Sequence, residues 1–254
     1  MPLRLAFDLD GVFADMDGEL TRQAESLFGE AMTRRLVTGP AAPIDAAAGG
    51  AGRADETGGA DGDENNSDDA PPLSKLQMTT RQTRRLWQHV QTIENFWETL
   101  KELEPGVIAR LAAIAADRRW EIIFLTKRPA SAGSTAQVQT QRWLESKGFA
   151  LPSVFVVQGS RGRIAASLHL DIVVDDTPEN CLDVVIDSEA RAILVWREDQ
   201  KLLPPAAKRL GIGVVKTVDE CLNILAQVDA PPEERPRMMA RVMRLLGLKE
   251  PASP

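Results

Sequence analysis

The feature that most constrains the fold is a regular alternation of short apolar runs with segments of helical periodicity. Each short run is apolar almost throughout, which is typical of strands that are buried on both faces. Strands of this kind alternate with helices in parallel sheets, so we predict a Rossmann-like α/β fold. The predicted strands are residues 3–7, 121–125, 153–157, 171–174, 192–196 and 214–216.

A long insertion separates the first two predicted strands. Within it, residues 79–103 carry apolar side chains at spacings of three and four, which predicts that this stretch is helical. We therefore expect a helical cap inserted after the first strand. The predicted organisation is a core formed by residues 1–22 and 95–228, a cap formed by residues 23–94, and a C-terminal amphipathic helix and tail at residues 229–254.

The net charge of −7 is concentrated in one segment of the predicted cap, residues 40–72, which holds eight acidic residues and one basic residue. Its only large aliphatic residue is Ile44, so it cannot bury enough surface to offset the entropy of ordering, and we predict a disordered acidic loop. The segment lacks the glycine and glutamate positions of a helix-loop-helix calcium site. The remaining chain is balanced in charge and shows no extended basic stripe, so no nucleic-acid partner is expected.

The sequence also indicates the compartment. No apolar run approaches the length of a membrane helix, and the N-terminus does not read as a secretory signal, so we expect no membrane association and a cytoplasmic protein. Cys181 and Cys221 have no disulfide or zinc spacing and are predicted to be buried thiols. The apolar face of the C-terminal helix is expected to pack on the core; the alternative is a partner surface that makes a homo-oligomer.

Polar residues stand where the predicted strands end. Asp8 and Asp10 follow the first strand, Thr126 the second, and Asp175 and Asp176 the fourth. The carboxyl ends of parallel strands meet at one edge of a sheet, where ligands bind. Carboxylates gathered there repel one another unless a cation lies among them, and Mg²⁺ prefers carboxylate oxygens. With a hydroxyl and a guanidinium nearby, such a site suits phosphoryl transfer. The alternative is that these residues only form a turn and a helix cap.

In this order on successive strands, the run Asp8-Leu9-Asp10-Gly11-Val12, then Thr126, a basic residue, and Asp175-Asp176 resemble the four motifs of the haloacid dehalogenase (HAD) superfamily. The resemblance implies that Asp8 is the nucleophile, which forms an aspartyl-phosphate. It implies that Asp10 protonates the leaving oxygen and later accepts a proton from water. It also implies that Asp8, the Asp10 carbonyl and Asp175 hold Mg²⁺, with Asp176 as a further ligand.

The basic motif departs from the family, in which a lysine is usual. We align Arg161 with that lysine and keep Arg163 as the alternative, since Arg163 could equally be a solvated residue in the first turn of a helix. Arginine keeps the charge but presents a planar fork, so phosphate binding is expected to survive. Thr126, Lys127, Arg161 and Arg163 are thus the expected substrate-binding residues, and Thr126 and Arg161 are also expected to act in catalysis.

The predicted cap indicates the size of the substrate. A cap of this type closes over a small diffusible molecule, so we expect a Mg²⁺-dependent phosphatase acting on a small phosphomonoester. Residues 94–106 locally resemble the cytosolic 5′-nucleotidase/deoxyribonucleotidase branch, which favours a 5′-nucleotide. Phe96 and Trp97 either stack a base there or pack in the core. Two alternatives stay open: a phosphate-ligand-binding protein without turnover, and a phosphatase acting on nucleic-acid ends.

Overall fold

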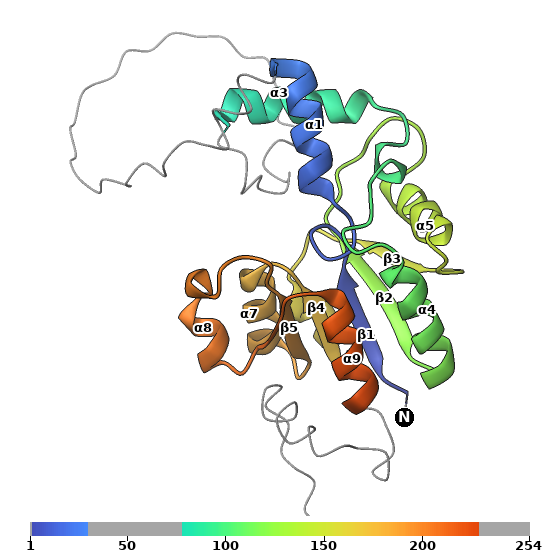
Figure 1. Ribbon diagram of the computed structural model, residues 1–254, viewed down its shortest axis with the longest axis vertical. Coiled ribbons are helices and arrows are strands. Elements are labelled where there is room, and N and C mark those ends of the chain that lie inside the picture. Colours follow the sequence, from blue (N-terminus) through green and yellow to red (C-terminus); the bar gives the residue numbers. More distant parts are fainter. Residues whose placement is uncertain (1, 30–77, 229–254) are drawn as a thin grey trace, which may run out of the picture.

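A computed structural model describes residues 2–29 and 78–228, which form a six-stranded sheet with helices on both faces (Figure 1). The strands lie in the order β3-β2-β1-β4-β5-β6, and every neighbouring pair is parallel. The predicted α/β fold is confirmed, and each predicted strand is present with its bounds shifted by one residue or less. The strands are β1 (Arg4–Asp8), β2 (Glu121–Thr126), β3 (Ser153–Val156), β4 (Ile172–Asp175), β5 (Arg191–Val195) and β6 (Gly213–Val215).

The two faces of the sheet have separate hydrophobic cores, because successive side chains of a strand point to opposite faces. In β1, Leu5 and Phe7 enter one core and Ala6 enters the other. The first core is covered by α4 (Val107–Arg118), α5 (Ala136–Ser146) and α9 (Val218–Val228). The second is covered by α6 (Arg161–Ser167), α7 (Pro178–Asp187) and α8 (Pro205–Arg209).

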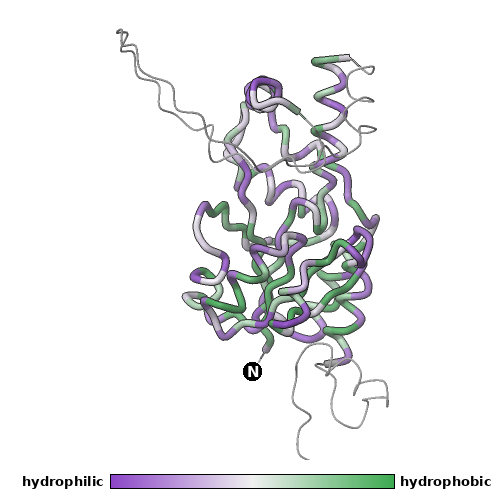
Figure 2. The backbone as a smooth tube through the Cα atoms, turned by 90° about the vertical axis from the view of Figure 1, so that its left-hand side faces the viewer, coloured by the Kyte–Doolittle hydropathy of each residue, from purple (hydrophilic) through white to green (hydrophobic). Residues whose placement is uncertain are grey.

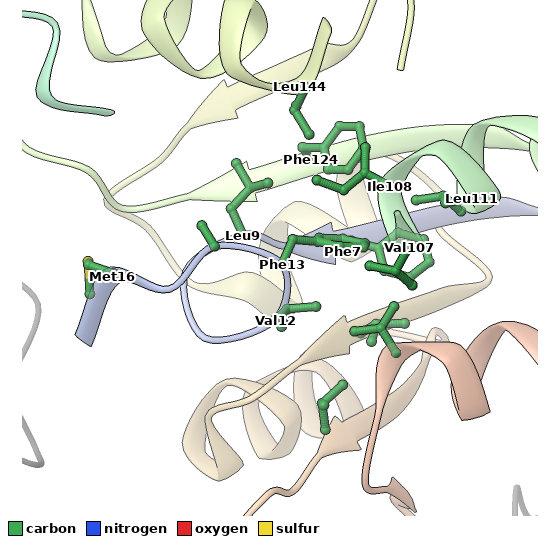
Figure 3. Packing of buried hydrophobic residues seen from close by; sticks show 14 of the residues in the cluster. Phe7, Leu9, Val12, Phe13, Met16, Val107, Ile108, Leu111, Phe124 and Leu144 are labelled. Carbon is green, nitrogen blue, oxygen red and sulfur yellow. The ribbon is translucent and has the colours of Figure 1, made fainter. Parts of the chain in front are cut away.

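The loop that follows β1 is anchored in the first core (Figure 3). Leu9, Val12 and Phe13 are fully buried, and the Phe13 ring lies 5.5 Å from that of Phe7 and 6.0 Å from that of Phe124. The backbone N–H of Phe13 also donates to the Leu9 carbonyl at 2.9 Å. Because the apolar residues of this loop are held on the core, the polar residues between them have a fixed position at the edge of the sheet.

Two helices, α1 (Met16–Phe28) and α3 (Thr80–Thr92), cross above the carboxyl ends of the strands (Figures 1 and 2). Leu20 of α1 and Leu86 of α3 are buried in the hydrophobic cluster that continues from the core. The expected boundary between core and cap at residue 22 falls inside α1. The predicted acidic loop at 40–72 and the predicted C-terminal helix at 229–254 lie outside the described residues.

The stretch predicted to be helical, residues 79–103, is an α-helix only in its first half. The helix α3 ends at Thr92, and the chain then forms a short 3₁₀ turn, η1 (Phe96–Glu98). The chain leaves the helix at Ile93, which is extended (φ −79°, ψ 121°). Asn95 then adopts a left-handed conformation (φ 51°), in which its side chain accepts a hydrogen bond from the Ser134 N–H at 3.0 Å. The apolar periodicity continues through the break because Phe96 and Trp97 are fully buried in the core, as one of the two interpretations expected.

Cys181 and Cys221 are buried free thiols, as predicted, and burial raises the pKa of both well above the usual range. Within residues 2–29 and 78–228, every helix is too short or too polar to cross a membrane. A second 3₁₀ turn, η2 (Gln200–Leu202), follows β5 and completes the regular structure of the described chain.

Candidate active site

A cavity of about 720 Å³ lies at the carboxyl ends of the strands, beneath the first turn of α1. It is centred where β1 lies between β2 and β4, the point at which the strand order reverses and where open parallel sheets bind ligands. Its size is that of a site for a small molecule. Among the predicted site residues, the lining includes Asp8, Asp10, Lys127, Arg161 and Asp176.

Three of the predicted residues do not line the cavity. Thr126 and Asp175 are almost fully buried behind it. Arg163 lies exposed on α6, outside the lining residues. The geometry therefore favours Arg161 over Arg163 for the basic position and gives no support to substrate binding by Arg163.

Arg161 lies between two of the predicted metal-binding carboxylates. Its Nη2 donates to Asp8 Oδ1 at 2.7 Å, and its Nε lies 3.7 Å from Asp175 Oδ2. The guanidinium is almost completely buried, so its charge interacts with both carboxylates at low dielectric. An arginine at this position therefore contacts Asp8 directly.

Close packing between α6 and α7 positions Arg161 at the start of α6. Ser160 caps the helix, and the Asp183 carboxylate of α7 accepts hydrogen bonds from Ser160 Oγ (2.8 Å) and from the Gly162 N–H (3.0 Å). A Cβ atom at Gly162 would lie only 2.2 Å from the Asp183 carbonyl oxygen. Only glycine therefore permits the helices to approach so closely that Arg161 faces Asp8.

We expect Gly162→Ala to destabilise the protein by about 2 kcal/mol, because the extra methyl group must push α6 away from α7. This corresponds to a loss of roughly 5 °C in Tm for a chain of this size. Gly159→Ala is the matched control, since a Cβ atom there would meet nothing within 4 Å. Thermal unfolding of both variants tests the packing argument, and equal Tm values for the two would contradict it.

Asp10 is held by hydrogen bonds on both carboxylate oxygens. Thr126 Oγ1 donates to Oδ2 at 3.0 Å. Arg128, which the sequence interpretation did not select, donates from Nε to Oδ2 at 2.9 Å and from Nη2 to Oδ1 at 2.7 Å. In this structure the Thr126 hydroxyl donates its hydrogen bond to Asp10. The resemblance had implied that it donates to a phosphoryl oxygen instead.

Asp175 is held from the first turn of α7. It accepts hydrogen bonds from the Thr177 N–H at 2.8 Å and from Asn180 Nδ2 at 3.0 and 3.1 Å. Asn180 is a second residue that the sequence interpretation missed. The Thr177 side chain makes no capping hydrogen bond to the helix and instead donates to Asp176. Asp175 and Asp176 are therefore more than parts of a helix cap.

Gly11 allows the loop after Asp10 to approach Asp176. Its φ is +84°, a conformation that residues with a side chain rarely adopt. A Cβ atom at this position would lie 1.9 Å from Asp176 Oδ2. The glycine thus brings the Asp10 loop against the carboxylate at the end of β4.

The three carboxylates of Asp8, Asp175 and Asp176 carry more negative charge than the neighbouring Arg161 can neutralise. Burial, and then the neighbouring Asp175, raise the pKa of Asp8 well above its ordinary value, although Arg161 lowers it. Burial and Asp175 likewise raise the pKa of Asp176 to about 7, and burial raises that of Asp175. Oxygen donors that destabilise one another's charge match the chemistry of a site for a hard divalent cation. Among residues 2–29 and 78–228, no three Asp, Glu, His or Cys side chains are grouped so that they could hold an ion together.

Comparisons with known proteins address the fold. No protein-family model matches the chain, and no curated protein matches it. A solved structure from Thermotoga maritima, assigned as a β-phosphoglucomutase, is 18% identical, with 89% of this chain and 99% of that chain covered and a TM-score of 0.50. This likeness shows a shared fold.

Two further solved structures match with lower scores. A HAD family hydrolase from Deinococcus radiodurans R1 with bound phosphate and sodium is 14% identical, with 90% of this chain and 96% of that chain covered and a TM-score of 0.48. A haloacid dehalogenase-like family hydrolase from Xanthomonas campestris is 14% identical, with 89% and 97% covered and a TM-score of 0.43.

Proposed function

We propose that this chain is a HAD-type phosphatase, dependent on Mg²⁺, that hydrolyses a small-molecule phosphomonoester through an aspartyl-phosphate. The observation that carries the proposal is the buried Arg161 guanidinium 2.7 Å from Asp8, at a cavity that Asp10 also lines. The proposal assigns the nucleophile to Asp8, the acid and base to Asp10, and the cation for the phosphoryl oxygens to Arg161. The fold shared with a protein assigned as a phosphomutase agrees with phosphoryl chemistry.

The proposed reaction has two steps. In the first, an Asp8 oxygen bonds to phosphorus, the bond from phosphorus to the leaving oxygen breaks, and Asp10 gives its proton to that oxygen. In the second, Asp10 takes a proton from a water molecule, whose oxygen bonds to phosphorus while the bond to Asp8 breaks and phosphate leaves. Throughout, Arg161 donates to phosphoryl oxygens as negative charge develops on them.

The proposed metal site consists of the Asp8, Asp175 and Asp176 carboxylates and the Asp10 carbonyl. Bound there, Mg²⁺ would neutralise charge on the phosphoryl group and among the carboxylates. Lys127, which is exposed and lines the cavity, is proposed as a further substrate-binding residue.

The cavity bears on the choice among phosphomonoesters. Its volume of about 720 Å³ leaves room for an organic leaving group beside the phosphate. A 5′-nucleotide is one such substrate, but Phe96 and Trp97 are fully buried and do not stack its base. Among the described residues that line the cavity, Trp196 is aromatic, and we propose it as the contact for a base or another ring.

Release of inorganic phosphate from a panel of phosphomonoesters tests the proposed function. We expect turnover of at least one small monoester with Mg²⁺ and none with EDTA. The panel should contain 5′-nucleotides, sugar phosphates and an oligonucleotide with a terminal phosphate. Turnover of the oligonucleotide alone would favour the end-processing alternative. Thermal stabilisation by a phosphorylated ligand without any hydrolysis would contradict an enzyme and favour the ligand-binding alternative.

A further inference from the structure

We propose that Arg128 is a positioning residue that fixes the carboxylate plane of Asp10, the acid and base of the reaction; this inference rests on the proposed function. Arg128 is only 1% exposed and is absent from the residues that line the cavity. It therefore acts on the substrate only through Asp10, which does line the cavity.

The contact between the two side chains is bidentate. Nε and Nη2 of Arg128 donate to different oxygens of Asp10, at 2.9 and 2.7 Å. Two parallel hydrogen bonds from a planar guanidinium fix the rotation of the carboxylate as well as its position. Thr126 Oγ1 adds a third hydrogen bond, to Oδ2 at 3.0 Å. The Asp10 side chain is thereby held by these three hydrogen bonds from two residues and still lines the cavity.

Arg128 is itself held rigidly. Its guanidinium carbon lies 4.9 Å from the ring centroid of Trp97 and 5.9 Å from that of Trp143. Its remaining terminal nitrogen, Nη1, donates to Thr140 Oγ1 at 2.8 Å. The Trp97 indole N–H donates to the Pro129 carbonyl at 3.0 Å, and the Trp143 indole N–H donates to the Leu100 carbonyl at 2.7 Å.

Burying the charged guanidinium of Arg128 costs free energy of folding, so its presence at this position calls for a functional reason. A buried charge is tolerated only when it is paired and hydrogen-bonded, and a well-packed apolar side chain between two tryptophans would stabilise the fold at least as well. In the proposed reaction Asp10 transfers a proton twice, first to the leaving oxygen and then from the water molecule. A carboxylate locked in one plane can serve both without reorganising between the steps.

The test compares substrates that differ in their need for a proton. An alkyl phosphomonoester requires protonation of its leaving oxygen, whereas p-nitrophenol leaves readily as the anion. We expect Arg128→Gln to lower kcat/KM for the alkyl ester by roughly 10²-fold and for p-nitrophenyl phosphate by less than roughly 10-fold. The ratio kcat/KM is the correct measure because it reports the steps up to departure of the leaving group.

Two further variants make the test decisive. Arg128→Lys keeps the charge but loses the fork, so it should show an intermediate loss with the same preference for p-nitrophenyl phosphate, and it provides the answer if Arg128→Gln does not fold. Arg142→Gln is the matched control, because Arg142 is an exposed arginine of α5 that contacts Glu98 on the surface; it should leave both substrates unaffected. Equal losses on the two substrates in the Arg128 variants would overturn the proposal.

A double-mutant comparison separates positioning from general damage. If Arg128 acts only through Asp10, then Arg128→Gln introduced into Asp10→Asn should lower kcat/KM no further. A second loss as large as that seen in the wild-type background would overturn the proposal. Wild-type turnover, measured first, tests the proposed function by itself, and the ratio between the two substrates tests the role of Arg128.

Discussion

Asp8→Asn is expected to abolish turnover, with kcat lowered by roughly 10⁴-fold or more. The amide cannot form the aspartyl-phosphate, so the first bond to phosphorus is not made. Each tenfold loss corresponds to about 1.4 kcal/mol of transition-state stabilisation. Release of phosphate from the best substrate of the panel measures the effect. Trapping of radiolabelled phosphate on the wild-type chain, but not on the variant, would identify the covalent step directly.

The same substitution should not weaken the fold. Because burial and the nearby carboxylates raise the pKa of Asp8, its ionised form is destabilised in the native state, and a neutral amide removes that cost. Arg161 keeps Asp175 as a partner at 3.7 Å. We therefore expect a Tm at or above that of the wild type. Lost activity together with a lowered Tm would instead indicate a structural role for Asp8.

Glu19→Gln is the matched control for Asp8→Asn. Glu19 is also a buried carboxylate, but it belongs to α1, pairs with Arg22 and does not line the cavity. Its substitution should leave kcat within roughly 2-fold of the wild type, as for a site away from the reacting groups.

Residual activity above a tenth of wild type in Asp8→Asn would contradict the assignment of the nucleophile.

The sequence was sufficient for the parts of the site that sit directly at strand ends. Asp8 and Asp175 are the last residues of β1 and β4, and pairing of these neighbouring strands brings them to one edge. Strand periodicity and turn residues are local signals, and the meeting of parallel strand ends follows from topology alone. Nothing beyond the order of the elements was needed to place these two carboxylates together.

The role of Arg128 in the site could not be predicted from its place after a strand. An arginine just after a strand is by default a solvated residue. Its burial depends on Trp97 and Trp143, which come from a 3₁₀ turn and from α5 and meet it only through tertiary packing. The irregular turn after α3 could not be predicted for a related reason, because the Asn95 side chain in that turn accepts its hydrogen bond from Ser134, which is distant in sequence.

The second large effect is expected in the dependence of stability on pH. The pKa of Asp176 is about 7 in the native protein, against an ordinary value of 3.8. Between these two values the native state holds more protons than the unfolded state, so the contribution of Asp176 to stability falls as pH rises through this window. At about pH 8 the raised pKa lowers the free energy of unfolding by at most about 4 kcal/mol, and at about pH 5 by less than half of that.

Asp176→Asn isolates this effect, because the amide carries no charge at any pH. With EDTA present, we expect the variant to be more stable than the wild type at about pH 8 and the difference to shrink toward pH 5. Chemical denaturation at several pH values measures it. A difference that stays constant with pH, or that grows as the pH falls, would contradict the elevated pKa.

Mg²⁺ should reverse the loss in the wild type, because a divalent cation supplies the positive charge that the cluster lacks. Binding competes with protons for the Asp176 carboxylate, so the rise in Tm on adding Mg²⁺ should be larger at about pH 8 than at about pH 5. At a concentration 100-fold above the Kd, binding adds about 2.7 kcal/mol to the free energy of unfolding. Asp176→Asn should show a smaller rise with a weaker dependence on pH, since Asp8 and Asp175 still bind protons in competition with Mg²⁺. The same rise at both pH values in the wild type would mean that Mg²⁺ binds elsewhere on the protein.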